Sequence, residues 1–226
     1  EEIAQQFNDY FVNIGKHISA NTTQSKVSFS SFLKGSNVKS LFLKPITEKE
    51  IIDIVLSFKN GKAPGYDCID SQVIKRAIHI LCKPLCNIFN HCFENGIFPD
   101  CCKISKVIPV HKSSSKNVFT NYRPISLLTC FSKVLEKCMS VRLLEFLDKN
   151  NILFSRQFGF RERHSTLLAL CDFLFNLNDA FENRENLLGL FVDLKKAFDS
   201  INHEILFYKL CFYGKRGVAL QLFKSY

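Results

Sequence analysis

One acidic residue stands where a carboxylate could bind a metal ion. Asp193 directly follows residues 187–192, a continuous apolar run with the length of a buried β-strand. A carboxylate at the exposed end of a buried strand is held rigidly while its charge stays accessible to a divalent cation. Asp is also a common N-cap residue, so Asp193 could instead begin the helix that follows it. From the spacing alone, both interpretations stay open.

Positive charge is concentrated in the middle of the chain. The formal net charge is +9, and residues 101–170 hold twelve Lys or Arg against four Asp or Glu, a difference of +8. Such a field attracts a polyanion, and nucleic acid is the commonest polyanionic partner of basic domains. A solvated basic surface without a ligand explains the charge equally well.

The ten cysteines are expected to be reduced thiols inside a cell, because the chain is long and no signal peptide begins it. His79, Cys82, Cys86, His91 and Cys92 superficially resemble a zinc-binding spacing. One predicted helix carries all five, whereas tetrahedral coordination needs ligands from more than one element. We therefore predict that these cysteines line an apolar core face. No run approaches the roughly 20 apolar residues that span a membrane.

The apolar periodicity predicts a largely helical chain with two short strands. Thr47 and Glu50 form a capping-box pattern for a short helix that ends at Asn60 and Gly61. Polar residues 21–40 are typical of a linker, so we divide the chain into a helical linker segment, 1–40, and a main domain, 41–226. The remaining expected elements are helices over 1–18, 71–94 with a kink at Pro84, 126–148, 166–181 and 197–212, strands over 107–110 and 187–192, a turn at 61–65, a loop at 112–117 and a break at 157–161.

Four segments resemble, in order, motifs of non-LTR (LINE-like, jockey-like) retrotransposon reverse transcriptases. Residues 61–67 (GKAPGYD) are similar to the loop that precedes the family's fingers, although Tyr66 and Cys68 replace its usual Pro and Gly. Residues 121–128 (NYRPISLL), continuing through Lys133 and Glu136, resemble the first fingers motif. Residues 157–161 (QFGFR), followed by His164 to Thr166, resemble the second fingers motif. Residues 191–201 (FVDLKKAFDSI) resemble the first palm motif. The segment 1–18 resembles the linker that follows an upstream endonuclease, which is absent here.

The resemblance implies an α+β right-hand polymerase fold, of which this chain supplies helical fingers and the first palm strand. It implies RNA-directed DNA synthesis, in which a primer 3′-hydroxyl attacks the α-phosphate of a deoxynucleotide. Two Mg²⁺ ions, with Mn²⁺ as a substitute, would lie roughly 3.5–4 Å apart and clamp the attacking and leaving oxygens. Asp193 and the backbone carbonyl of Leu194 would bind metal.

The resemblance also assigns contacts to the substrates, which are an RNA template, a DNA primer and deoxynucleoside triphosphates. Phe198 would lie under the nucleotide sugar and exclude a 2′-hydroxyl. Arg161 would grip the triphosphate as a bidentate fork, helped by Arg123. Lys62 and Arg163 would contact template or primer. From the residues alone, Phe198 reads as a core aromatic and the cations as surface charges. In the family this reaction occurs on chromosomal DNA, so a nuclear site of action is expected.

No paired-aspartate motif lies between Asp193 and Tyr226. The first residue is not Met, so we expect both ends to be cuts and the family's other metal-binding carboxylates to lie beyond Tyr226. This polypeptide alone should then be inactive and poorly soluble, with an unpaired strand edge. A non-catalytic, nucleic-acid-binding remnant of a decayed element is the alternative. A magnesium nuclease would need further clustered acids or a Gly-rich phosphate loop, which the sequence lacks.

Overall fold

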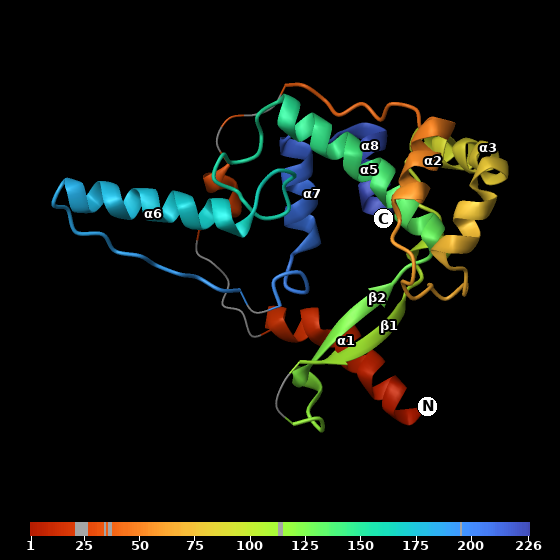
Figure 1. Ribbon diagram of the computed structural model, residues 1–226, viewed down its shortest axis with the longest axis horizontal. Helices are drawn as coiled ribbons and strands as arrows, with labels where there is room; N and C mark the ends of the chain where they lie inside the picture. The colour runs from red at the N-terminus through yellow and green to blue at the C-terminus, as the bar shows by residue number, and fades with distance from the viewer. Residues whose placement is uncertain (21–26, 34, 36–37, 113–114, 195) are drawn as a thin grey trace. The chain divides into compact units, whose positions relative to one another are not determined.

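Helices make up most of the chain, with a single small sheet (Figure 1). The computed structural model describes residues 1–20, 27–33, 35, 38–112, 115–194 and 196–226. Among them, no helix combines the length and hydropathy needed to cross a membrane. The elements are α1 (Glu2–Ala20), η1 (Phe29–Phe32), α2 (Glu48–Ser57), α3 (Ser71–Asn95), α4 (Asp100–Lys103), β1 (Lys106–His111), η2 (Phe119–Asn121), β2 (Tyr122–Leu127), α5 (Cys130–Lys149), α6 (Thr166–Glu182), α7 (His203–Phe212) and α8 (Gly217–Ser225).

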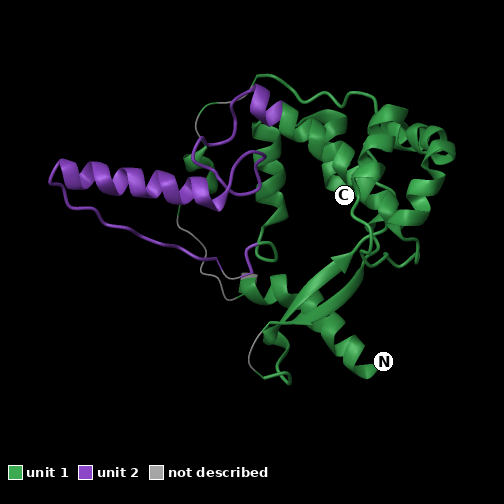
Figure 2. Ribbon diagram, in the orientation of Figure 1, with its two compact units in different colours: residues 1–145, 198–226 green, residues 146–197 purple. Residues whose placement is uncertain are grey.

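The chain forms two compact units, shown in different colours in Figure 2. Unit 1 comprises residues 1–145 and 198–226, and unit 2 comprises residues 146–197. The linker expected at 21–40 lies largely outside the described residues, as do residues 113–114 of the predicted loop. The division of the chain at residue 40 stays a prediction.

The core of unit 1 lies between α2, α3, α5 and α8. Ile51 and Val55 lie one turn apart on α2 and are fully buried, as are Ile78 of α3, Leu135 of α5 and Leu222 of α8. Cys82, Cys86 and Cys92 of α3 and Cys138 of α5 belong to the same cluster. The prediction that the cysteines of the 79–92 region line an apolar core face is therefore confirmed.

The predicted N-cap of α2 is found and α3 is capped at both ends, while the kink expected at Pro84 stays a prediction. Thr47 caps α2, since its hydroxyl accepts a hydrogen bond from the Glu50 amide at 3.2 Å. Asp70 caps α3 by accepting from two amides at 2.9 Å, and Gly96 ends α3 at φ 65°. Pro84 stands inside α3, which continues through it. Because the ring removes one backbone donor and crowds the preceding turn, burial of the apolar face must outweigh that cost.

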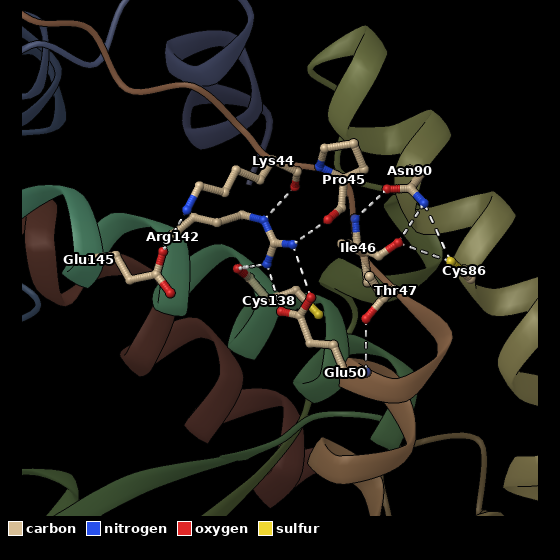
Figure 3. A network of polar contacts seen from close by, with 10 residues as sticks. All are labelled: Lys44, Pro45, Ile46, Thr47, Glu50, Cys86, Asn90, Cys138, Arg142 and Glu145. Carbon is tan, nitrogen blue, oxygen red and sulfur yellow. Dashed lines mark hydrogen bonds and ion pairs between the residues drawn. The ribbon is translucent and has the colours of Figure 1, made fainter.

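The Glu50 carboxylate has a different partner from the one a capping box requires. It accepts two hydrogen bonds from the Arg142 guanidinium, at 2.7 and 3.0 Å, from across the core (Figure 3). Arg142 also donates to the backbone carbonyls of Lys44, Pro45 and Cys138. The capping box is thus half correct, and Glu50 instead joins α2 to α5.

An antiparallel hairpin of β1 and β2 forms the only sheet of the described residues. β1 confirms the strand expected over 107–110, whereas β2 was not predicted and includes Ser126, which we expected in a helix. Pro109 faces Pro124 across the pair. Proline is tolerated in strands that have a free edge, and both strands of a two-stranded sheet have one.

The remaining helices differ partly from expectation. α6 matches the helix expected over 166–181 and is capped by Ser165, whose hydroxyl accepts from the Leu168 amide. The helix expected over 197–212 is shorter, because residues 196–200 form a turn and Asn202 caps α7. α8 was not predicted. Gly214, at positive φ, lies between α7 and α8, and Gly217, also at positive φ, begins α8.

Candidate functional site

The first two family-like motifs pack against each other in unit 1. A Cβ atom added at Gly65, in the loop 61–67, would lie 2.7 Å from the backbone nitrogen of Thr129, just after β2. Only glycine permits this close approach of two backbones. Tyr66 fastens the loop further, since its hydroxyl donates to the carbonyl of Cys101 at 2.9 Å. Lys62 is exposed at the start of the loop.

Cys68 adopts the left-handed backbone conformation, at φ 54°. Its amide donates to the Gly65 carbonyl at 3.3 Å, which closes the turn. This is the position where the resembled family usually has glycine, the residue that adopts such a φ most easily. The Cβ of Cys68 is strained in this left-handed conformation, because it lies close to the following carbonyl oxygen.

The hairpin presents a basic surface. Residues 106–127 contain four Lys or Arg and no Asp or Glu. Arg123 is exposed on β2 and pairs with Val110, so the two side chains share one face of the hairpin. Lys106 and Ile108 belong to the same face by strand alternation. Lys112 and Lys116 are exposed beyond the end of β1.

Two predicted contact residues, Arg161 and Arg163, lie in unit 2. The Arg161 guanidinium is 3.6 Å from the Asp148 carboxylate and donates to the carbonyl of Phe154 at 3.3 Å. Its side chain is 21% exposed, which leaves part of it accessible to a ligand. Arg163 is exposed at φ 58°, in the turn before α6. Arg161 therefore already has an anionic partner, which a bound phosphate would have to displace.

The predicted strand before Asp193 is wrong. Residues 187–194 are irregular, and Leu188 and Leu190 are 94% and 85% exposed. A strand needs a neighbour to pair its backbone groups, and among the described residues β1 and β2 pair only with each other. Asp193 and Leu194 are consequently exposed, and Lys195 of the same motif lies outside the described residues.

The described residues contain no group of three or more His, Cys, Asp or Glu side chains placed to hold a metal ion. Asp193 is thus a single accessible carboxylate. Phe198 and Asp199 follow in the turn 196–200, belong to unit 1 and are exposed, with Phe198 at 76%. Within unit 1, the structure brings together the loop 61–67 and the segment after β2. Asp193 and Arg161 both belong to unit 2.

The sequence profile of the reverse transcriptase (RNA-dependent DNA polymerase) family matches residues 110–224, about half of the chain. The chain belongs to the reverse transcriptase family. The matched part of the chain begins in β1, includes Arg123, Arg161, Asp193 and Phe198, and ends in α8. A reverse transcriptase domain that is mostly helical with a small sheet agrees with the expected α+β class.

Similar curated proteins come from mobile elements of Drosophila melanogaster. The RNA-directed DNA polymerase from mobile element jockey is 32% identical over 179 residues, 79% of this reverse transcriptase chain and 20% of that protein. The probable RNA-directed DNA polymerase from transposon BS is 29% identical over 211 residues, 93% of this chain and 23% of that protein. The chain thus spans about a fifth of these relatives' length. The resemblance to jockey-like, non-LTR reverse transcriptases is confirmed.

Sequence reasoning missed Arg142, a buried residue of this reverse transcriptase with a relative exposure of 6%. Charged residues of a helix usually point to solvent, so an arginine in the helix expected over 126–148 gives no reason to predict burial. The guanidinium also lies over the Phe93 ring, 5.1 Å from its centroid. A signal was available in Glu50, an acid beside the apolar stripe of α2 that needs a buried cation if its face is covered.

Proposed function

We propose that this chain forms part of an RNA-directed DNA polymerase that copies retrotransposon RNA into DNA. The observation that carries the proposal is the order of four family motifs along a chain whose residues 110–224 match the reverse transcriptase family. The relatives named as RNA-directed DNA polymerases support it. The substrates would be an RNA template, a DNA primer and deoxynucleoside triphosphates, and the reaction would occur in the nucleus.

The proposed substrate contacts follow the motifs. Phe198 would select deoxynucleotides by blocking a 2′-hydroxyl, and Arg161 would bind the triphosphate after releasing Asp148. Arg123, on the basic face of the hairpin, would add a second contact to phosphate. Lys62 and Arg163, which are exposed on loops, would contact template or primer. Within a right-hand polymerase, the hairpin region would belong to the fingers and residues 187–194 to the palm.

Asp193 and the Leu194 carbonyl are the proposed ligands for the two Mg²⁺ ions, or for Mn²⁺ in their place. The described residues supply one carboxylate here and no metal-binding cluster, so these residues alone do not fit a two-metal site. Mg²⁺ requires nearly octahedral oxygen ligation from several groups. When bound, the ions would stabilise the charge of the reacting phosphate.

RNA-templated primer extension tests the proposal. A polypeptide that carries residues 1–226 together with a paired-aspartate motif should extend a DNA primer on RNA in a metal-dependent manner. Asp193→Ala should abolish extension, because a metal ligand is lost. Residues 1–226 alone should not extend the primer. Persistent activity of the Asp193→Ala variant would refute the metal role, and extension by residues 1–226 alone would overturn the expectation of inactivity.

A second candidate function is nucleic-acid binding without catalysis. Two observations favour it: the environment of Asp193 is irregular and exposed, and the hairpin region of unit 1 has four cations and no acid. Binding of a labelled single-stranded RNA should then weaken with salt. A double Lys106→Ala, Arg123→Ala variant should bind more weakly, whereas Asp193→Ala should bind unchanged. Equal binding by the double variant and the unsubstituted chain would exclude the hairpin as the binding surface.

A further inference from the structure

Helix α1 lies outside the part of the chain matched by the family, yet it contacts Phe119 and Tyr122 inside that part. Its first half packs against the hairpin through four aromatic rings. The Phe7 ring lies edge-on to those of Phe119 and Tyr122, at centroid distances of 4.8 and 4.9 Å. Tyr10 stacks on Phe119 at 5.6 Å. Figure 1 shows α1 crossing the hairpin.

The second half of α1 approaches a different motif. A Cβ atom added at Gly15 would lie 2.8 Å from the backbone oxygen of Asp199, closer than real Cβ contacts allow. Ile14, the preceding residue, is buried at 4% exposure. Glycine inside a helix is unfavourable relative to alanine because of its backbone entropy. Gly15 is explained by this close approach, which joins residues 184 positions apart.

We propose that α1 positions the turn 196–200 relative to the hairpin, and that Gly15 is a specificity-determining positioning residue. The turn carries Phe198, and the helix that meets it through Gly15 is fastened at its other end to the strand that carries Arg123. A side chain at position 15 displaces the backbone beside Phe198. The effect that we infer for Gly15, on the choice between deoxynucleotides and ribonucleotides, rests on the proposed function.

The contact itself is testable without catalysis, because the chain has no Trp. Phe198→Trp places a sole fluorescent reporter in the turn. Adding Gly15→Ala should lower the fluorescence anisotropy and raise iodide quenching, while far-UV circular dichroism stays the same or gains helix. Val12→Ala is the matched control, since Val12 is 65% exposed on the same helix and also gains helix propensity. Identical anisotropy and quenching in all three polypeptides would overturn the proposal.

The role in selection is tested by primer extension with a polypeptide that carries residues 1–226 and a paired-aspartate motif. Gly15→Ala should reduce the preference for deoxynucleotides over ribonucleotides about tenfold in kcat/KM, the low end of what pocket shape contributes. Val12→Ala should retain it. Unchanged preference despite a shifted reporter would overturn the specificity role. If the unsubstituted polypeptide does not copy RNA at all, the proposed function fails, and the reporter separately decides whether Gly15 positions the turn.

Discussion

At the scale of single residues, Cys68 carries strain that glycine would remove. Its φ of 54° places the Cβ near the following carbonyl oxygen, which costs about 1–2 kcal/mol. Glycine loses more backbone entropy on folding, by about 0.4–1 kcal/mol. Cys68→Gly should therefore raise the free energy of unfolding by about 0.5–1 kcal/mol in urea denaturation. Cys68→Ala keeps a Cβ and should give no gain, so equal stabilisation by both variants would contradict the strain argument.

Arg161 is held by Asp148, and releasing it should favour triphosphate binding. The pair is 3.6 Å apart and the Asp148 side chain is 59% exposed, so the interaction is weak and can be displaced. Asp148→Asn should raise the affinity for a deoxynucleoside triphosphate about two- to fivefold, as measured by calorimetry. Asp172→Asn is the control, since it releases Arg156 from a comparable ion pair of 3.4 Å in the same unit. Equal effects of both variants would show a general charge effect.

Glu136 should make stability depend on pH. Burial raises the pKa of its carboxyl, although the hydroxyls of Tyr226 and Ser132 donate to it at 3.1 and 3.5 Å and partly oppose the shift. When the folded state raises the pKa of a carboxyl, the free energy of unfolding of the protein falls as the pH rises through that pKa. Glu136→Gln should therefore be more stable than the unsubstituted chain at pH 7, with the difference vanishing below the ordinary Glu pKa. A difference that persists at pH 3 would contradict this.

At the scale of elements, Arg142 connects three parts of unit 1. It donates to two carbonyls of the segment before α2, to Glu50 of α2, and to its own helix α5 (Figure 3). Removing the guanidinium leaves Glu50 and the carbonyls without their donor. Because Glu50 is 24% exposed and water can partly replace the donor, Arg142→Leu should cost about 3 kcal/mol, the low end for a broken buried pair.

The control lies one turn further along α5. Glu145 and Lys44 form an ion pair of 3.5 Å with side chains 58% and 72% exposed. Glu145→Gln should cost less than about 1 kcal/mol, since exposed ion pairs contribute little. Denaturation of both variants in urea measures the contrast. Similar losses would mean that the Arg142 network contributes no more than a surface ion pair.

The helices of this chain are predictable because local signals define them. Thr47, Asp70 and Ser165 accept hydrogen bonds from the first-turn amides of α2, α3 and α6, and the apolar spacing between caps identifies each buried face. The sheet is less predictable. β2 contains Pro124, which argues against a strand unless the edge is free, and whether an edge is free is a tertiary property.

The candidate site was predictable in part. The motifs correctly indicated the family, whereas the left-handed conformation of Cys68 was seen only in the structure. The environment of Asp193 was not predictable, because an apolar run becomes a buried strand only if another strand pairs with it. The contact of Gly15 with Asp199 left no periodic pattern, since it joins distant segments through one missing side chain.

At the scale of the whole molecule, the two units differ in whether their helices enclose a buried apolar cluster. Unit 1 has a buried cluster between its helices, whereas in unit 2 Leu167 and Phe175 of α6 are 66% and 72% exposed. Residues 187–192 add an exposed, irregular apolar segment. An apolar surface of this kind commonly marks a face that binds another protein segment. We expect the dye ANS to bind the chain at α6 and at residues 187–192.

Hydrogen exchange tests whether residues 187–192 need a partner strand. In residues 1–226 alone, their amides should exchange nearly as fast as in an unfolded peptide, while those of α3 and α5 are protected by the core. In a polypeptide that also carries a paired-aspartate motif, pairing with a second strand should slow exchange of residues 187–192 by at least about a hundredfold, equivalent to roughly 2.7 kcal/mol of local stability. Protection in residues 1–226 alone would show that the strand forms without that partner. Fast exchange in both polypeptides would show that Asp193 is not placed at the end of a palm strand.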